Sequence, residues 1–386
     1  MNINFTKETI ACCQLGRVLG FNPVAGHHLL EYTGNAYDVF TMKTAELRSL
    51  LGTEPPSGLD MAGLDYSARE LEGLAEKGSY FLGVTDEAFP PLLLECGDAP
   101  MGLYIRSDSA PEEIFRKRPY IAVVGTRDIS HYGMEWCQKL TSAMCSCTNI
   151  PAIVSGLALG TDIIAHKTAL EYGSPTIAVM ATGIDLVYPR MHTFDADRIA
   201  ASPGSALVTD YPPGTVPAAQ NFLRRNRIIA GLSDATILIE SRVKGGGMST
   251  AALAFSYSRD IYALPGKIDD VRSGGCNKLI ADNKAGLILT PRDLLDKLGL
   301  CSKRSFKGIR DMPLPIPEGL FPPEDSEMAE NVLKLIRRKR GISKEEICAT
   351  LEAGIGQVSG ILSLLESEGL IFVDLLGNCS AKNNFQ

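Results

Sequence analysis

The residues of this sequence that could do chemistry fall into four short clusters, rich in glycine, arginine and hydroxyl side chains. The first cluster is Gly125, Thr126 and Arg127, shortly before a stretch with helical spacing. A glycine turn lets a ligand approach the backbone, and a helix start supplies free amides beside the fixed charge of Arg127. The cluster favours a phosphate ligand, with a structural tight turn and an ion-paired Arg127 as the alternative.

The second cluster contains Ser155, Gly156 and Gly160 and leads into a predicted helix that includes His166. Its glycines only resemble a dinucleotide-binding loop, because Gly-x-x-x-Gly stands where Gly-x-Gly-x-x-Gly is typical. We expect Asp162 to be the N-cap of the helix. We expect His166, one turn further on, to be a packed histidine and not a catalytic base.

The third cluster is the most informative, because three arginines follow an aromatic residue at the start of an apolar helix. Arginine forks bind phosphates bidentately, and a neighbouring aromatic ring can stack on an unpaired base. The alternative is a solvated basic face with the aromatic ring in the core. The cluster consists of Asn221, Phe222, Arg224, Arg225, Asn226 and Arg227.

The fourth cluster is Lys244 followed by Gly245, Gly246 and Gly247, again ahead of a predicted helix. Amides that no side chain obstructs form a nest for anions. The cluster is not a Walker loop, because the closing Gly-Lys-Ser/Thr is missing. No Cys/His pair, Ser/His/Asp arrangement or carboxylate cluster of recognisable spacing accompanies the four clusters, so we predict an anion-binding protein that is not an enzyme.

The charge of the chain is unevenly distributed. Its 386 residues are 45% hydrophobic and 22% charged, close to the soluble globular average, and the net charge is −7. Residues 1–120 hold 10 Lys and Arg against 17 Asp and Glu, whereas residues 121–300 hold 17 against 16. The acidic total alone argues against a nucleic-acid ligand, but a local basic patch is compatible with the middle of the chain.

The ten cysteines and five histidines have no zinc-ligand spacing, and no Cys-x-x-Cys pair occurs. We therefore expect reduced thiols, no metal and no cofactor. No apolar run approaches the ~20 residues of a membrane span, and residues 1–9 do not resemble a signal peptide. The sequence predicts a cytoplasmic protein with no membrane partner.

Short apolar runs that end in Gly, Ser, Asp or Thr alternate with stretches of helical spacing through the middle of the chain. Continuous apolar strands alternating with helices indicate a parallel sheet covered on both faces. The predicted fold class is α/β, with an extended Rossmann-like, doubly wound core whose ligands bind beyond the carboxyl ends of the strands. The runs are residues 121–125, 152–156, 176–183, 206–210, 235–241, 261–266 and 286–290.

Four parts of the chain are predicted. Residues 1–75 are expected to form a small helical domain of SAM or helix-hairpin-helix type, and residues 76–300 the Rossmann-like core. Residues 301–324 are rich in proline and predict an extended linker. Residues 325–386 have the pattern of three helices and a two-stranded wing, which indicates a winged helix. Two further strands are expected at residues 80–84 and 103–105.

The order of these motifs resembles that of the DprA/Smf family of DNA-processing proteins. The resemblance spans about residues 81–295 and is specific, because many motifs recur in one order. They include Val-Val-Gly-Thr-Arg127, Ser155-Gly-Leu-Ala-x-Gly160-x-Asp162-x-x-Ala-His166, Tyr188-Pro189, Phe222-x-x-Arg225-Asn-Arg-Ile-Ile-Ala-Gly-Leu232 and Leu264-Pro-Gly266.

The resemblance implies a non-catalytic, single-stranded DNA-binding protein that protects incoming DNA and loads the RecA recombinase during natural transformation. It also implies a homodimer. The DNA contacts of the family map to Arg127, to Arg190 and to Phe222 as the base-stacking aromatic. Pattern and resemblance together predict DNA contacts at Gly125, Thr126, Arg127, Ser155, Gly156, Gly160, Arg190, Asn221, Phe222, Arg224, Arg225, Asn226, Arg227, Lys244, Gly245, Gly246 and Gly247, where Gly245-Gly-Gly247 replaces the usual Ser-Gly-Ser of the family.

Two alternatives from other classes stay open. Rossmann-like nucleotide phosphoribohydrolases resemble the core, but Leu253 stands where their glycine-rich loop has its glutamate. A winged-helix transcription regulator would read DNA with residues 355–365, which contain no Lys or Arg. For the dimer, we predict a surface at Asn277, Leu279 and Ile280.

Overall fold

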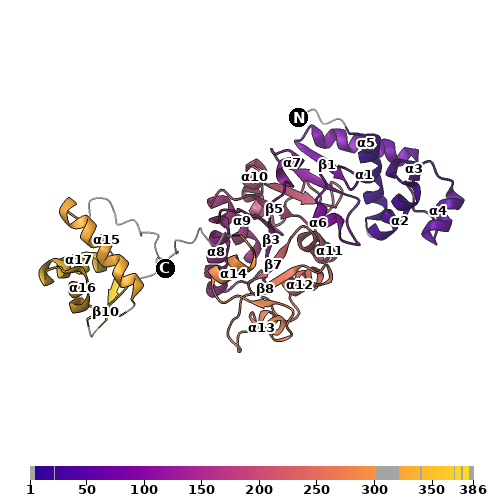
Figure 1. The fold of residues 1–386 in the computed structure, drawn as a ribbon. Helices are drawn as coiled ribbons and strands as arrows, with labels where there is room; N and C mark the ends of the chain where they lie inside the picture. The colour runs from indigo at the N-terminus through magenta and orange to yellow at the C-terminus, as the bar shows by residue number, and fades with distance from the viewer. Residues whose placement is uncertain are drawn as a thin grey trace. The chain divides into compact units, whose positions relative to one another are not determined.

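The computed structural model describes residues 5–20, 22–300, 321–339, 341–368, 370–374 and 377–381. The chain divides into two compact units, Met1–Cys301 and Ser302–Gln386 (Figure 1). Each unit has its own hydrophobic core. The predicted proline-rich linker, residues 301–324, lies mainly outside the described residues.

A nine-stranded sheet forms the centre of the larger unit. Its strands are β1 (Ser79–Gly83), β2 (Gly102–Arg106), β3 (Tyr120–Val124), β4 (Ala152–Ser155), β5 (Thr176–Val179), β6 (Ala206–Thr209), β7 (Ala235–Leu238), β8 (Asp260–Ala263) and β9 (Gly286–Leu287). The order across the sheet is β1-β2-β6-β5-β4-β3-β7-β8-β9. All neighbours from β6 to β9 run parallel, whereas β1 is antiparallel to β2 and β2 to β6.

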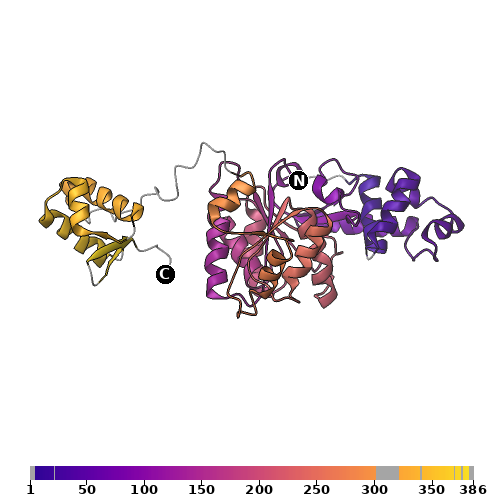
Figure 2. The same cartoon turned by 60° about the horizontal axis from the view of Figure 1, so that its bottom comes forward.

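Helices cover both faces of the sheet. The helices after β1 are α6 (Pro91–Leu94), α7 (Pro111–Ile114), α8 (His131–Cys145), α9 (Thr161–Glu171), η1 (Arg190–His192), α10 (Thr193–Ala201), α11 (Ala219–Gly231), α12 (Gly246–Ser256), α13 (Gly274–Ala281) and α14 (Pro291–Lys297). Figures 1 and 2 show α8, α9 and α14 on one side of the strands and α11 and α12 on the other. Strands β3, β4 and β5 are buried along their whole length, which explains their continuous apolar sequences.

The chain progresses in two directions across the sheet. From β3 it moves through β4 and β5 to β6, and then it returns to the other side of β3 and continues through β7 and β8 to β9. A crevice forms at the carboxyl ends of the strands where the direction reverses, because the connecting helices there leave toward opposite faces. This switch point lies between β3 and β7.

The predicted mixed α/β fold with a large central sheet is confirmed, and all seven apolar runs contain strands. The sheet is larger than its parallel part, because residues 80–84 and 103–105 pair with each other and extend it at the β6 edge. Four predicted runs were too long by three or four residues: residues 176–183 leave the sheet after Val179, residues 235–241 after Leu238, residues 261–266 after Ala263 and residues 286–290 after Leu287. The residues that follow these strands belong to the loops above the sheet.

Five helices precede the sheet: α1 (Lys7–Leu19), α2 (Pro23–Thr33), α3 (Ala36–Val39), α4 (Thr44–Leu51) and α5 (Met61–Ala75). Four of them start at a side chain that accepts a backbone N–H, since Thr6, Asn22, Asn35 and Asp60 each cap a helix, whereas α4 has no side-chain cap. Their buried faces join the main core. At the junction with β2, the Tyr104 hydroxyl donates to Glu70 Oε1 (3.1 Å), and Arg17 pairs with the same carboxylate.

The smaller unit contains α15 (Pro323–Arg338), β10 (Ile342–Ser343), α16 (Lys344–Leu351), α17 (Ile355–Ser367), β11 (Ile371–Val373) and β12 (Asn378–Ala381). Its sheet is antiparallel with the order β10-β12-β11. Its core includes fully buried Val332, Ile336, Ile347 and Leu365. Within the described residues, no single helix is long and apolar enough to cross a membrane, and only the bent pair α16 and α17 satisfies length and composition together.

The cysteines of the described residues are mostly inert. Eight of them are free thiols, and burial raises the pKa of Cys13 and Cys137 to about 12. A thiol with so high a pKa holds almost no reactive thiolate at neutral pH. The expectation that every cysteine is reduced is wrong for Cys147, which is disulfide-bonded.

The separate core of the smaller unit predicts that it unfolds separately. We expect two transitions in calorimetry of the full chain, and Ile336→Ala should lower only one of them. Removing a fully buried isoleucine costs about 2–5 kcal/mol, which is about 8 °C or more for a unit of this size. The matched control is Ile355→Ala, because Ile355 is 58% exposed. A single transition that shifts as a whole would contradict two separate cores.

Candidate functional site

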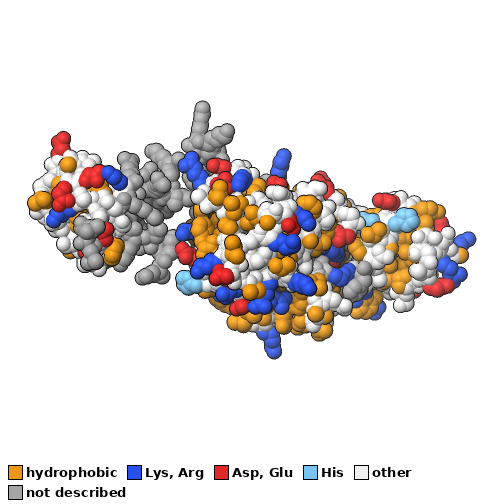
Figure 3. Space-filling view, turned by 90° about the horizontal axis from the view of Figure 1, so that it is seen from below, with side chains coloured by type: hydrophobic (Ala, Val, Ile, Leu, Met, Phe, Trp, Pro, Cys, Tyr) orange, Lys and Arg blue, Asp and Glu red, His pale blue; other side chains and the backbone are white. Residues whose placement is uncertain are grey.

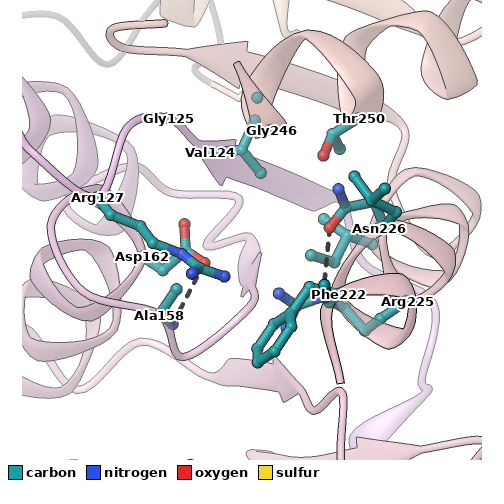
Figure 4. Close-up of a pocket in the computed structure, with 14 residues that line it drawn as sticks. Val124, Gly125, Arg127, Ala158, Asp162, Phe222, Arg225, Asn226, Gly246 and Thr250 are labelled. Atoms are coloured by element: carbon teal, nitrogen blue, oxygen red, sulfur yellow. Dashed lines mark hydrogen bonds between the residues drawn. The ribbon is translucent and has the colours of Figure 1, made fainter. Parts of the chain in front are cut away.

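A cleft of about 500 Å³ opens at the carboxyl ends of the central strands, at the switch point of the sheet. The loops after β3 and β4 form one wall, and the starts of α11 and α12 form the other (Figure 4). The lining residues are Val124, Gly125, Arg127, Ala158, Asp162, Ala219, Phe222, Leu223, Arg225, Asn226, Ile229, Gly246, Gly247 and Thr250.

An arginine and an aromatic ring face each other across this cleft. Arg127 comes from the β3–α8 loop and Phe222 from the first turn of α11, and the guanidinium carbon lies 4.8 Å from the ring centroid. The ring of Tyr188 continues the cluster, 5.6 Å from that of Phe222. Arg127 is exposed and Tyr188 is 44% exposed. The cleft therefore presents a cation and aromatic faces together to an incoming ligand.

The loop that holds Arg127 is fixed by its neighbour. Thr161, the first residue of α9, uses its backbone N–H and its hydroxyl to donate to the Thr126 carbonyl, both at 3.2 Å. The carbonyl of Thr126 is therefore held at the start of α9. Two segments that are distant in sequence thus set the direction from which Arg127 enters the cleft.

Two helices begin at the cleft without a side-chain cap. The N-cap positions are Ala218 for α11 and Gly245 for α12, and neither supplies a capping oxygen. The first helical residues, Ala219 and Gly246, line the cleft. The first amides of a helix have no partner within the helix and lie at the positive end of its dipole. Two helix starts side by side therefore form an anion-binding wall.

Gly246 keeps this wall open. A Cβ atom at Gly246 would meet no heavy atom within 4 Å. By contrast, a Cβ at Gly247 would lie 2.6 Å from Leu238 Cδ1. The space in front of Gly246 thus belongs to the cleft, and a side chain placed there would occupy it without disturbing the fold.

The predicted cluster of three arginines serves the protein's own structure. Arg225 is 4% exposed, donates to the carbonyl of Gly156 (2.6 Å) and also to the carbonyl of Val179. Arg227 forms a buried ion pair with Asp210 at 2.6 Å, away from the cleft lining. Arg224 donates to the carbonyl of Gly20 in the N-terminal helices.

Burial changes the acidity of two groups beneath the cleft. It lowers the pKa of the Arg225 guanidinium to about 10, and it raises the pKa of the Asp162 carboxyl, which the nearby charge of Arg225 opposes. The two groups stabilise each other's charged forms. Asp162 is not the N-cap that we expected, because Gly160 occupies that position and the Asp162 carboxylate accepts from the Ala158 N–H (3.3 Å).

His166 is a packed histidine, as we predicted. It is fully buried, and its Nδ1 lies 2.7 Å from Thr176 Oγ1. The Thr176 hydroxyl gives its only proton to the Ile153 carbonyl (2.8 Å), so the histidine Nδ1 must be the donor. Its Nε2 is buried without a hydrogen-bond partner. Burial lowers the pKa of His166 to about 3.

The structure brings together only part of the predicted DNA-contacting set. Arg190 on η1 and Lys244 before α12 are exposed outside the lining. Ser155 is fully buried and donates to the Val123 carbonyl (2.6 Å). The predicted residues in the lining are Gly125, Arg127, Phe222, Arg225, Asn226, Gly246 and Gly247; those outside it are Thr126, Ser155, Gly156, Gly160, Arg190, Asn221, Arg224, Arg227, Lys244 and Gly245.

Several lining residues were not among the predicted DNA contacts. Ala158, Ala219 and Thr250 enter the cleft because of their place at helix starts or in loops, which composition does not reveal. Tyr188 belongs to a recognised motif, but its contact with Phe222 depends on the fold.

The predicted dimer residues are largely occupied within the chain. The side chain of Asn277 exchanges two hydrogen bonds with the backbone of Gly266, both at 3.1 Å. Leu279 is buried in the core, and Ile280 is half-buried against it. No group of three metal-ligating side chains occurs among the described residues.

Comparison with known proteins gives consistent matches. The family model described as DNA recombination-mediator protein A matches residues 80–299. Protein Smf from Synechocystis sp. is 33% identical over 325 residues, which cover 78% of this chain and 80% of that protein. The DNA processing protein DprA from Streptococcus pneumoniae is 36% identical over 212 residues, which cover 55% of this chain and 72% of that protein.

Two solved structures are similar to this chain. The X-ray structure of DprA from Streptococcus pneumoniae has a TM-score of 0.64 at 29% identity and covers 76% of this chain and 99% of that one. A structure of DprA from Helicobacter pylori, determined for its single-stranded DNA binding mode, has a TM-score of 0.51 at 29% identity. It covers 57% of this chain and 95% of that one.

The environment of Arg225 predicts a large loss of stability on its removal. Arg225→Met leaves two strand-end carbonyls without their donor and Asp162 without its nearby cation, so the free energy of unfolding should fall by about 3–5 kcal/mol. The matched control is Arg127→Met, an exposed arginine, whose effect should stay within about 0.5 kcal/mol. Urea unfolding of both variants measures the difference, and equal losses would contradict the structural role of Arg225.

The buried His166 predicts a loss of stability in acid. Its pKa is about 3 in the folded protein against 6.5 ordinarily, so the unfolded chain binds more protons between these values. The contribution of His166 to the free energy of unfolding is therefore fully present above pH 6.5 and decreases as the pH falls toward 3. Between pH 7 and pH 5 the decrease is on the order of 2 kcal/mol. In His166→Asn, whose amide can replace the Nδ1 donor, this part of the pH dependence should disappear. Urea unfolding at a series of pH values gives the free energy of unfolding of both proteins. If this free energy depends on pH equally in the two, the loss of stability in acid does not come from His166.

Proposed function

Because the chain belongs to the DNA recombination-mediator protein A family, we propose that it processes DNA by binding a single strand in the cleft at the carboxyl ends of its strands. One observation supports this function above all: Arg127 and Phe222 face each other in a cleft that the uncapped starts of α11 and α12 also line. These groups match the two repeating parts of a nucleic-acid strand. The helix amides and Arg127 suit phosphates, and Phe222 suits a base.

The aromatic part of the cleft favours a single strand over a duplex. A base can stack on Phe222 only when one of its faces is free, and in a duplex both faces are covered by neighbouring bases. The contact is tolerant of sequence, because every base has an aromatic face. The Helicobacter pylori relative is described as binding single-stranded DNA, which supports the same ligand for this chain.

We assign the proposed DNA contacts by their place in the cleft lining and, outside the lining, by their exposure. Arg127, Phe222, Gly125, Gly246 and Gly247 line the cleft and form its centre. Exposed Arg190 and Lys244 would approach the strand from the rim. The internal hydrogen bonds of Arg224, Arg225 and Arg227 favour a supporting role.

The wider role follows from the family resemblance. We propose that the protein is cytoplasmic, protects incoming DNA and loads RecA during natural transformation, and that it acts as a homodimer. The proposed role is not catalytic: Asp162 is the one carboxylate among the described residues that line the cleft, and its carboxylate accepts a backbone N–H. A phosphoribohydrolase-like reaction would need the acid/base glutamate of that family, and Leu253 stands at its position here, which disfavours that alternative.

For the remaining parts of the chain we propose the domains expected from the sequence. The five helices α1 to α5 support a SAM or helix-hairpin-helix-like domain in residues 1–75, followed by the Rossmann-like domain in residues 76–300. Three helices and a small antiparallel sheet support a winged helix in residues 325–386. Helix α17 contains no Lys or Arg, which disfavours base reading by this part of the chain.

The proposed site predicts which variants lose single-stranded DNA. Phe222→Ala should weaken binding of an oligothymidylate by about 1–3 kcal/mol, since one stacked base is lost. Arg127→Ala should likewise weaken binding. Because one phosphate contact is lost, the slope of log affinity against log salt concentration should become shallower by about 0.7. Fluorescence anisotropy across a salt series, with a duplex for comparison, measures both effects.

Two further variants complete this experiment. Gly246→Asp places a negative charge in open cleft space at a helix start, where it should abolish DNA binding without loss of thermal stability. Phe255→Ala is the matched control. Phe255 lies on the C-terminal part of α12, is 57% exposed and has the cation of Lys284 over its ring. Unchanged affinity in Gly246→Asp and Phe222→Ala would rule out this cleft as the DNA site.

A further inference from the structure

A second pair of arginine and aromatic side chains lies beyond the cleft, on α10. Phe194 is 72% exposed, and the guanidinium carbon of Arg198 lies 5.9 Å from the centroid of its ring. The two residues are four positions apart on one helix, so they share a face. Met191, just before this helix, is 73% exposed. Large apolar side chains that are exposed to this extent on one short segment indicate an interaction site.

This segment, residues 180–201, is continuous with the cleft. It begins after β5, and its Tyr188 ring contacts the Phe222 ring at 5.6 Å. Its middle is anchored to the cleft wall, because the ring of buried His192 donates to the Leu157 carbonyl (2.9 Å), next to cleft-lining Ala158. The exposed side chains from Tyr188 to Phe194 are therefore held on the same framework as the cleft.

The charge of the segment suits a polyanion. Each of its three carboxylates has a partner within the protein: Asp185 accepts from the Gly214 N–H (2.8 Å), Asp195 pairs with Lys167 (3.4 Å) and Asp197 with Arg106 (2.6 Å). Arg190 and Arg198 are exposed and form no ion pair within the described residues. Figure 3 shows the larger unit from below, where Lys and Arg side chains gather among apolar side chains, whereas α10 lies near the top of this unit in Figure 1.

We propose that a single DNA strand leaving the cleft over Tyr188 continues along Met191 to a second binding step formed by Phe194 and Arg198. Phe194 stacks a base and Arg198 binds the neighbouring phosphate, as Phe222 and Arg127 do inside the cleft. This inference rests on the proposed function, since it extends the same strand. Along the segment, the aromatic rings of Tyr188 and Phe194 alternate with the cations Arg190 and Arg198, as bases alternate with phosphates along a strand, which favours DNA over a purely apolar protein partner.

The test compares strand lengths. Oligothymidylates from about 4 to about 16 nucleotides cover the site sizes known for single-strand grooves, and fluorescence anisotropy of the full chain gives the affinity for each. In the variant Phe194→Ala/Arg198→Ala, short strands should bind as in the wild type, whereas long strands should lose about 5- to 150-fold in affinity. In Phe222→Ala, strands of every length should bind more weakly.

A matched control separates this site from general effects. Phe255→Ala/Lys284→Ala removes another exposed pair, whose cation also lies 5.9 Å from the ring centroid, and it should bind all strands as the wild type does. Equal affinities of the wild type and the Phe194/Arg198 variant at every length would overturn the proposal. An accompanying change in sedimentation would then assign this surface to a protein contact.

Cross-linking distinguishes failure of this inference from failure of the proposed function. A strand that contains 5-iodouracil at one position at a time should cross-link to the peptide with Phe222 from one position and to the peptide with Phe194 from a different one. Cross-links confined to Phe222 would overturn the second binding step and leave the cleft in place. A wild-type protein that binds no strand of any length would overturn both.

Discussion

The geometry of the larger unit depends on one buried guanidinium. Arg225 lies beneath the cleft and donates to the carbonyls of Gly156, directly after β4, and of Val179, the last residue of the neighbouring parallel strand β5. Strand ends leave carbonyl groups without a ladder partner, and such groups are costly when they are buried. Arg225 satisfies them from the helix on the opposite side of the cleft. A Cβ atom at Gly156 would lie 2.5 Å from the guanidinium, so the glycine is required by this contact.

The same contact positions the residues that we propose to bind DNA. Phe222 precedes Arg225 by three positions on α11, about one turn, so fixing Arg225 fixes the ring. The opposite wall is set by Thr161, which holds the loop of Arg127. The protein thus uses arginine in two ways. Buried Arg225 holds the walls of the cleft in place, whereas exposed Arg127 is the arginine that we propose to contact the ligand, and residue type alone does not distinguish the two roles.

This difference limits what the sequence could predict. The sheet followed from continuous apolar runs, and the location of the cleft followed from the rule that ligands bind at strand ends. Arg127 and Phe222 could be singled out by their place in glycine-rich and helix-start segments. The internal role of Arg225 could not, because it depends on carbonyls from β4 and β5 that only the fold brings within reach. For the same reason the position of Asp162 beside Arg225, and that of Tyr188 beside Phe222, appeared only in three dimensions.

The uncapped starts of α11 and α12 have a consequence for the empty protein. A side-chain cap is worth about 1 kcal/mol to a helix, and these two helices forgo it, so water must hydrate their first amides. An anion bound in the proposed site would supply the missing acceptors and release that water. Ligand binding would therefore stabilise the first turns of these helices, because the ligand would accept hydrogen bonds from amides for which the chain provides no side-chain acceptor. The first turns of α11 and α12 should accordingly exchange their amide hydrogens more slowly once the cleft is occupied.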